Sequence, residues 1–388
     1  GFQVRESFTQ NREHIARKPI MTTDALTLIT TVDELRYYLK EAMKLEHATI
    51  PPYITALYSL KPGTNLEAFH IIRQVAVEEM LHLTLVANVF NAVGGDIQGT
   101  LTAPDFVPKY PTFLPTGETD FQVSLSPFSP KTVETFRKIE RSQPMAEGMP
   151  LVKARNREED YQQYLLSVQG YKDPYTFYSI GLFYAEIIRG LNYLYKQMGN
   201  ALFCGDPSKQ ITPEYYYNGG GDIIPVTDLR SAIRALRVIQ EQGEGSRVAT
   251  IYDAERELGH EFRFEQLELG QYYVVDREDP EKSDKPHHPT GEKFEVGWDQ
   301  VYPIKENASL SDYPEGSEVY EAAVNFRNAY SEFLRTLETA FNGKPDELIP
   351  AVGGMFRLKE LVNQLVRNPI PGLHGIHAAP IFPEPPAL

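Results

Sequence analysis

Apolar residues recur at helical spacing in several long blocks of the chain. The first predicted helix, residues 30–50, begins with a Thr/Asp capping signal and carries an inward stripe from Leu35 onward at spacings of three and four residues. Glu46 falls on this stripe. Pro51 and Pro52 follow directly and predict a kink or a bend at the end of the helix.

A second block, residues 66–95, shows the same pattern after the turn at residues 61–65. It ends at a Gly-Gly stop. Its inward stripe consists of Ile72, Val75, Glu79, His82, Val86 and Val89. Both of the first two predicted helices therefore place polar side chains on an otherwise apolar face.

The rest of the chain predicts further helices separated by irregular segments. Helical patterns cover residues 173–199, 227–242, 248–270, 316–342 and 350–367. Pro, Ser and aromatic residues dominate residues 96–174, which predicts a long connection with short elements, including Pro-bounded strands near residues 121–126. We expect a mainly α fold, with an N-terminal extension (1–30), one helical domain (31–372) with inserted loops 96–174 and 271–315, and a C-terminal tail (373–388).

Cysteine usage limits the kinds of metal site that the chain can build. Its 388 residues contain one cysteine, Cys204, which excludes an internal disulfide framework and Cys-rich zinc or iron–sulfur sites. Carboxylate and imidazole remain as metal ligands. The composition fits a reducing compartment, and we expect a cytoplasmic protein.

Charge and hydropathy argue against nucleic acid and membrane as partners. The formal net charge of −15 repels phosphate backbones. No apolar run approaches the roughly 18–20 residues that span a bilayer, and residues 1–21 lack a hydrophobic signal core. A hydrophobic content of 41% is enough for a large buried core.

The geometry of a helical hairpin brings three of these polar residues to one level. If Gly63 marks the apex between the first two helices, Glu46 precedes it by about as many residues as Glu79 and His82 follow it. At about 1.5 Å of rise per residue, all three lie roughly 25 Å from the turn. A Glu/His pair spaced i, i+3 on one helix and a Glu on its neighbour form half of a dinuclear carboxylate site. A cation would offset the cost of burying two adjacent carboxylates.

Several residues are candidate ligands for a second half-site. Glu257 and His260 repeat the i, i+3 spacing, although the stripe of that predicted helix is better drawn through other residues. Glu186 lies one position off the best stripe of its helix. Glu241 and Glu244 flank a glycine at a helix end, where they are either ligands or an ordinary polar turn.

Several of these segments together resemble a known family. The motifs "LEHATIPPYITALYSL", "VAVEEMLHLTLVANVFNAVGG", "SIGLFYAEI", "IQEQGEGS", "GHEFRFEQL" and "MFRLKELVNQLVRNPIPG" are similar to those of ferritin-like proteins related to iminophenyl-pyruvate dimer synthases of violacein and rebeccamycin assembly. The resemblance covers about residues 30–372 and departs from the family pattern at Leu182, where a polar or acidic residue is frequent. It implies a ferritin-like four-helix bundle with extra C-terminal helices. It also implies a metal site using Glu46, Glu79 and His82, with His260 and an acid of "EQGEG".

Three functions are compatible with these features. The first is a non-haem metal-dependent oxidoreductase of secondary metabolism, with mono- or dinuclear iron or another divalent transition metal, acting on dioxygen and a small aromatic or amino-acid-derived substrate. Long loops that could cover a pocket, together with 23 tyrosines, favour it. The alternatives are a ferroxidase or metal-storage protein and a non-catalytic binding module. A homo-oligomer is compatible with all three.

Overall fold

The computed structural model describes residues 29–115, 120–141, 180–217, 219–244, 258–276 and 278–385. Helices dominate this part of the chain, and only isolated β-bridges are present in it. The helices are α1 (Val32–Ala48), α2 (Ile50–Ser59), α3 (Leu66–Ala92), α4 (Pro130–Ile139), α7 (Ile180–Met198), α8 (Leu229–Glu244), α9 (His260–Leu269), α10 (Glu318–Phe341) and α11 (Leu348–Val366). The predicted mainly α fold is confirmed.

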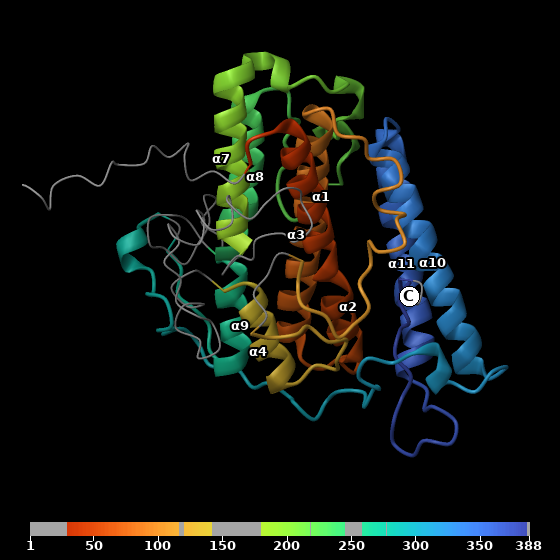
Figure 1. Cartoon of the computed structure of the whole chain (residues 1–388). Helices are drawn as coiled ribbons and strands as arrows, with labels where there is room; N and C mark the ends of the chain where they lie inside the picture. Colours follow the sequence, from red (N-terminus) through yellow and green to blue (C-terminus); the bar gives the residue numbers. More distant parts are fainter. Residues whose placement is uncertain are drawn as a thin grey trace, which may run out of the picture.

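Four of these helices form a bundle. Helix α1 packs against α3 and α7, and α8 packs against both α3 and α7 (Figure 1). Their facing sides carry a continuous apolar core that includes Leu39, Ile72, Ile187 and Leu236. Within the described ranges, no helix is both long and apolar enough to cross a membrane.

Two helical pairs flank the bundle. The C-terminal hairpin of α10 and α11 lies along one side, where α11 contacts α2 and α10 contacts α3 (Figure 1). At one end of the bundle, α4 packs closely against α9, and α9 also touches α3 and α8. The second pair therefore adds two helices beside the middle of α3, where the polar residues of its inward stripe lie.

The prolines after α1 end that helix rather than kink it. Helix α1 stops at Ala48, and α2 begins at Ile50 with Pro51 and Pro52 in its first turn. Because proline has no N–H, Pro52 cannot bond the carbonyl oxygen of Ala48. The Tyr110 hydroxyl, 2.6 Å away, donates to that oxygen instead.

Two other sequence expectations differ from the structure. Of the helix expected over residues 248–270, residues 248–257 lie outside the described residues. The expectation is wrong at Leu258 and Gly259, which are not helical, and α9 begins at His260 with Gly259 as its N-cap. The strands expected near residues 121–126 reduce to one bridge, between Thr112 and Val123. Short pairings of this kind lack neighbouring strands to extend them.

Helix α3 also anchors the segment that enters α8. The Asn88 amide donates to the carbonyl oxygens of Ile211 and Ile224, at 3.0 and 3.1 Å, and accepts from the Ile211 N–H at 2.8 Å. Gln210 donates in return to the Asn88 carbonyl oxygen at 2.8 Å. Asn88 is fully buried, so this side chain satisfies backbone groups that water does not reach.

We predict that Asn88→Ala destabilises the protein by roughly 2–4 kcal/mol, because it leaves three buried backbone groups without partners. Urea unfolding followed by circular dichroism measures this free energy. Asn328→Ala is the matched control, since Asn328 is exposed on α10, and it should change stability by less than about 0.5 kcal/mol. Equal stabilities of the two variants would contradict the anchoring role.

Candidate metal centre

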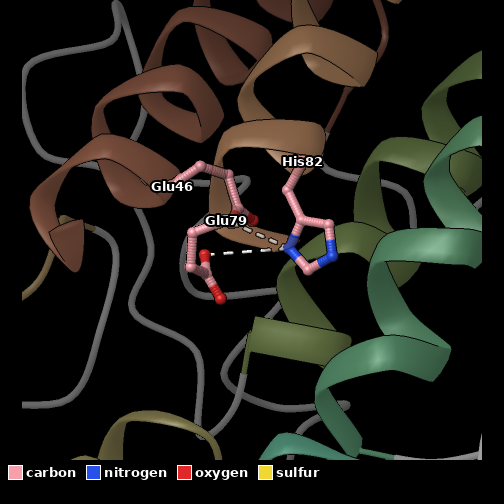
Figure 2. A group of neighbouring side chains, drawn as sticks. All are labelled: Glu46, Glu79 and His82. Atoms are coloured by element: carbon pink, nitrogen blue, oxygen red, sulfur yellow. Dashed lines mark hydrogen bonds and ion pairs between the residues drawn. The ribbon is translucent and has the colours of Figure 1, made fainter. Parts of the chain in front are cut away.

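Two helices bring the first group of candidate ligands together. Glu46 on α1 and Glu79 and His82 on α3 are all buried, and one ligand atom from each lies within 4.8 Å of the others (Figure 2). His82 Nδ1 lies 3.2 Å from Glu46 Oε2 and 3.7 Å from Glu79 Oε2. The level placement expected from the hairpin therefore appears as a compact carboxylate/histidine group.

A second group forms around the same Glu79. It adds Glu140, the C-cap residue of α4, and His260, the first residue of α9, and all three side chains are buried. His260 Nδ1 lies 3.3 Å from Glu79 Oε1 and 3.5 Å from Glu140 Oε2. The close packing of α4 on α9 brings these two helix ends to α3.

Glu79 thus lies between the two histidines. Its Oε2 faces His82 and its Oε1 faces His260. The two imidazole rings are nearly parallel, with centroids 5.7 Å apart and an interplanar angle of 20°. Dinuclear carboxylate centres in helical bundles likewise draw Glu and His ligands from several helices.

The remaining nitrogen of each imidazole is held by a hydrogen bond. His82 Nε2 lies 2.7 Å from Gln242 Oε1, and the amide of Gln242 donates to the Gly220 carbonyl oxygen, so its oxygen is directed toward the ring. His260 Nε2 lies 2.7 Å from Glu78 Oε2. Because each Nε2 faces an acceptor, Nε2 carries the proton and Nδ1 is directed at the carboxylates, as in metal-bound histidines.

Glu78 is itself held in place by an arginine. Arg263 on α9 donates to both carboxylate oxygens of Glu78, at 3.0 and 3.4 Å. Arg263 also donates to the Leu258 carbonyl oxygen at 2.6 Å, which fixes the residues just before α9. The contact between Glu78 and His260 is therefore supported by a third buried group.

Tyrosine hydroxyls hold the two outer carboxylates. Tyr184 on α7 donates to Glu46 Oε1 at 2.5 Å, and Tyr53 on α2 donates to Glu140 Oε1 at 2.7 Å. Both rings are fully buried. In each case the second oxygen of the carboxylate faces a histidine, so the tyrosine sets which oxygen is available at the centre.

Burial and crowding shift the ionisation of these groups. Burial, reinforced by the negative charges of Glu46 and Glu140, raises the pKa of Glu79 well above its usual range. Burial alone would lower the pKa of both histidines. The Glu46 carboxylate nevertheless raises the pKa of His82, and Glu78 with Glu140 raises the pKa of His260 well above its usual value. Without a cation, these shifts favour the protonated forms of Glu79 and both histidines.

The donor set fits a transition-metal ion. Glu79 Oε2 and His260 Nδ1 are buried and have no hydrogen-bond partner within the described ranges. Leaving buried polar atoms unsatisfied costs about 1–3 kcal/mol each, and a cation would satisfy both. Carboxylate oxygen and imidazole nitrogen together suit iron, manganese or zinc, and each group offers three ligand atoms.

The other predicted ligands have different positions. Glu186 is buried and forms an ion pair with Arg189 one turn further along α7. It belongs to neither of the two ligand groups found in the described part of the chain. Glu241 lies half-buried on α8. Helix α8 extends to Glu244, whose side chain lies outside the described residues, as does all of Glu257. These four assignments stay predictions.

Two contributors were absent from the predicted set, and both carried a sequence signal. Glu140 follows a short helix that begins with Ser129-Pro130, an N-cap and N1 signature, and it continues the buried stripe of Val133 and Phe136. Residues 129–140 fall within the predicted loop 96–174, so the short helix was missed. Gln242 extends the stripe through Ala232, Ala235 and Ile239. Its side chain is a neutral amide, so it is not a candidate when only carboxylates and imidazoles are considered as ligands.

A cavity of about 640 Å³ adjoins the centre. It lies among α2, α3, α11 and the residues that precede α8. Glu78 and Gln242, the residues that hold the Nε2 atoms of His260 and His82, both line it. Each histidine is therefore separated from the cavity by a single side chain.

Comparisons with known proteins agree with this architecture. The chain aligns with the solved structure of a ferritin-like protein from Caulobacter vibrioides with a TM-score of 0.57 and 21% identity, over 91% of this chain and 98% of the other. No curated protein matches the chain. A family model described as ferritin-like matches residues 39–269, which is more than half of the sequence and contains every residue of both ligand groups. The chain therefore belongs to the ferritin-like family.

Proposed function

We propose that this protein is a non-haem metal-dependent oxidoreductase. Its buried carboxylate/histidine centre would hold one or two divalent transition-metal ions, with iron the first candidate, and act on a small aromatic or amino-acid-derived substrate and dioxygen. The resemblance to proteins related to iminophenyl-pyruvate dimer synthases supports this class of substrate and a role in secondary metabolism. We place the activity in the cytoplasm.

The observation that carries the proposal is the position of Glu79. Its two oxygens face the Nδ1 atoms of two histidines that come from different helices, and each histidine has a further carboxylate beside it. A purely structural ion pair needs only one partner for each charge. Two sets of three ligand atoms around one shared carboxylate would instead hold metal ions. Three protein ligands for each ion would leave coordination positions free for a substrate.

The side chains around the centre have separate roles. A bound non-haem metal ion would supply redox and Lewis-acid chemistry. Gln242 and Glu78 orient the two imidazoles, and Tyr184 and Tyr53 orient the outer carboxylates. The surrounding core excludes water from all ligand atoms, because each side chain in the two groups is at most 3% exposed.

Metal stoichiometry should distinguish the two ligand groups. We predict that Glu79→Ala loses metal from both groups, while Glu46→Ala affects only the first and Glu140→Ala only the second, each with an affinity loss of about tenfold or more. Elemental analysis of protein purified without chelators, followed by equilibrium dialysis, measures this. Glu321→Gln, at an exposed position of α10 outside both groups, is the control and should retain wild-type metal content.

Metal binding should strengthen as the pH rises. Raised pKa values favour the protonated forms of Glu79, His82 and His260, and a cation must displace those protons from the ligand atoms. For each proton released, the logarithm of the affinity should rise by about one per pH unit. Calorimetry in buffers of different ionisation enthalpy counts these protons. An affinity that does not change between pH 6 and 8 would argue against binding at these residues.

Catalysis is tested by oxygen consumption of the metal-loaded protein across a panel of aromatic amino acids and their imino and keto derivatives. We expect substrate-dependent uptake in the wild type and a loss of at least about 100-fold in Glu79→Ala, whose shared ligand is missing. Equal rates in the two proteins would remove the catalytic interpretation. Rapid iron oxidation with retention of a mineral, without any effect of the organic compounds, would favour iron storage.

A further inference from the structure

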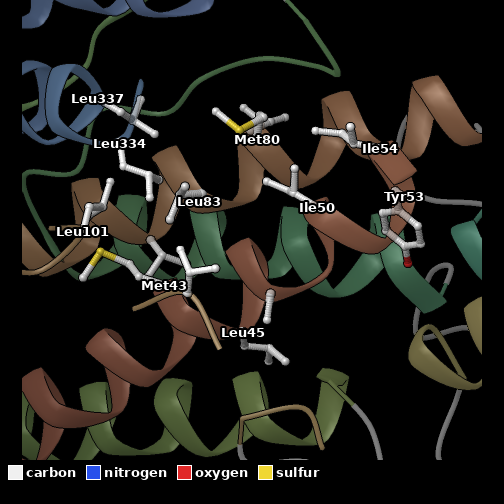
Figure 3. Packing of buried hydrophobic residues seen from close by; sticks show 14 of the residues in the cluster. Met43, Leu45, Ile50, Tyr53, Ile54, Met80, Leu83, Leu101, Leu334 and Leu337 are labelled. Atoms are coloured by element: carbon white, nitrogen blue, oxygen red, sulfur yellow. The ribbon is translucent and has the colours of Figure 1, made fainter. Parts of the chain in front are cut away.

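The walls of the cavity beside the centre are mostly apolar. Side chains from α2, α3 and α11 contribute Ile50, Ile54, Leu57, Met80, Met355 and Leu358. Figure 3 shows Ile50, Ile54 and Met80 on adjacent turns of α2 and α3. A volume of about 640 Å³ falls within the range of sites that bind small molecules. The cavity therefore suits a ligand with an apolar body.

The two ends of the cavity differ in exposure and charge. Arg73 and Gln74 line its outer end and are exposed, whereas Glu78 and Gln242 line its inner end and are nearly fully buried. Arg73 precedes Glu78 by five residues on α3, which corresponds to about 7.5 Å along the helix axis. A ligand that spans this length would touch both ends.

Arg73 is the cation that remains available in the cavity. Within the described ranges its guanidinium forms no ion pair with a carboxylate, and its positive charge acts on the nearby Tyr58, which also lines the cavity. The carboxylate at the inner end is already engaged, because Glu78 pairs with Arg263 and His260. An incoming anion would therefore meet an unpaired positive charge at the outer end and a compensated charge at the inner end.

We propose that this cavity binds a small monocarboxylic acid with an apolar body. Its carboxylate pairs with Arg73, and its body lies along the apolar wall and ends at Glu78 and Gln242. The assignment of this cavity as the substrate pocket of the metal centre rests on the proposed function. Binding of the acid itself requires no metal ion. The ligand would make contact with the centre through the two side chains that hold His260 and His82.

The charge of the ligand follows from the same contacts. A cationic group would be repelled by Arg73 at the outer end, and a neutral ligand would gain no ion pair with the guanidinium. An acid without an apolar body, such as propanoate, would leave most of the wall uncovered. Both the carboxylate and the apolar body are therefore needed for strong binding.

Calorimetry with the full chain tests the proposal, using 3-phenylpropanoate as the probe and 3-phenylpropylamine and propanoate as comparisons. We expect the phenyl acid to bind at least about tenfold more tightly than either comparison compound. Arg73→Met should weaken its binding by about tenfold or more, and Arg73→Lys by less, because lysine keeps the charge without the planar fork. Arg357→Met, at an exposed position of α11 outside the cavity, is the matched control and should bind like the wild type.

A second variant tests the volume of the cavity. Ala76 lines it on α3 and is half-buried, so Ala76→Phe places a ring in the space and should abolish binding while circular dichroism shows a folded protein. Equal affinities for acid and amine, or wild-type binding by Arg73→Met, would overturn the proposal.

Measurements on metal-free and metal-loaded protein and on Glu79→Ala separate this proposal from the proposed function. Acid binding by the wild type and by Glu79→Ala, in a protein that never takes up metal, would retain the pocket and reject the oxidoreductase. Metal uptake at the centre without acid binding would reject the pocket alone.

Discussion

The centre of this protein depends on one buried carboxylate that has acidic neighbours on both sides. Glu79 lies in a group with Glu46 and in another with Glu140, and burial adds to their repulsion. An arrangement of this kind is stable only if protons or cations compensate the charge. The two histidines beside Glu79 provide a place for either, since each directs Nδ1 at one of its oxygens. The demand for compensation links folding, protonation and metal binding at the same atoms.

The fold meets this demand by combining helices from distant parts of the chain. Helices α1 and α3 supply Glu46, Glu79 and His82 as neighbours within the bundle. The second group is built from helix ends, because Glu140 caps α4 and His260 starts α9. The other two bundle helices contribute supporting hydrogen bonds through Tyr184 and Gln242.

The same supporting residues connect the centre to its surroundings. Glu78 and Gln242 each contact an imidazole on one side and the cavity on the other. Gln242 also donates to the Gly220 carbonyl oxygen, in the segment that Asn88 anchors to α3. Gly220 has a φ of +83°, and its α-carbon approaches α3 so closely that a Cβ would lie 2.9 Å from the Glu78 Cα. A side chain there would push the segment away from both the cavity wall and Gln242.

The sequence by itself determined most of the long helices and the first ligand group. Apolar spacing located α1, α3, α8, α10 and α11 and the C-terminus of α7 to within a few residues, and the hairpin geometry placed Glu46, Glu79 and His82 at one level. The start of the helix predicted over residues 173–199 lies outside the described residues. These features are local, because they depend on helical periodicity and on one short turn. The position of the cavity has no comparable local signal, since its walls come from α2, α3, α8 and α11.

Tertiary structure decided the second group. His260 faces the centre because α9 begins at that residue, so the periodicity of the preceding residues does not set its direction. Glu140 reaches Glu79 only through the packing of α4 on α9, and Gln242 rather than Glu241 faces His82 because it lies on the buried side of α8. Spacing within one helix shows which side chains share a face. Which helix ends meet is determined by how separate segments bury their apolar surfaces against one another.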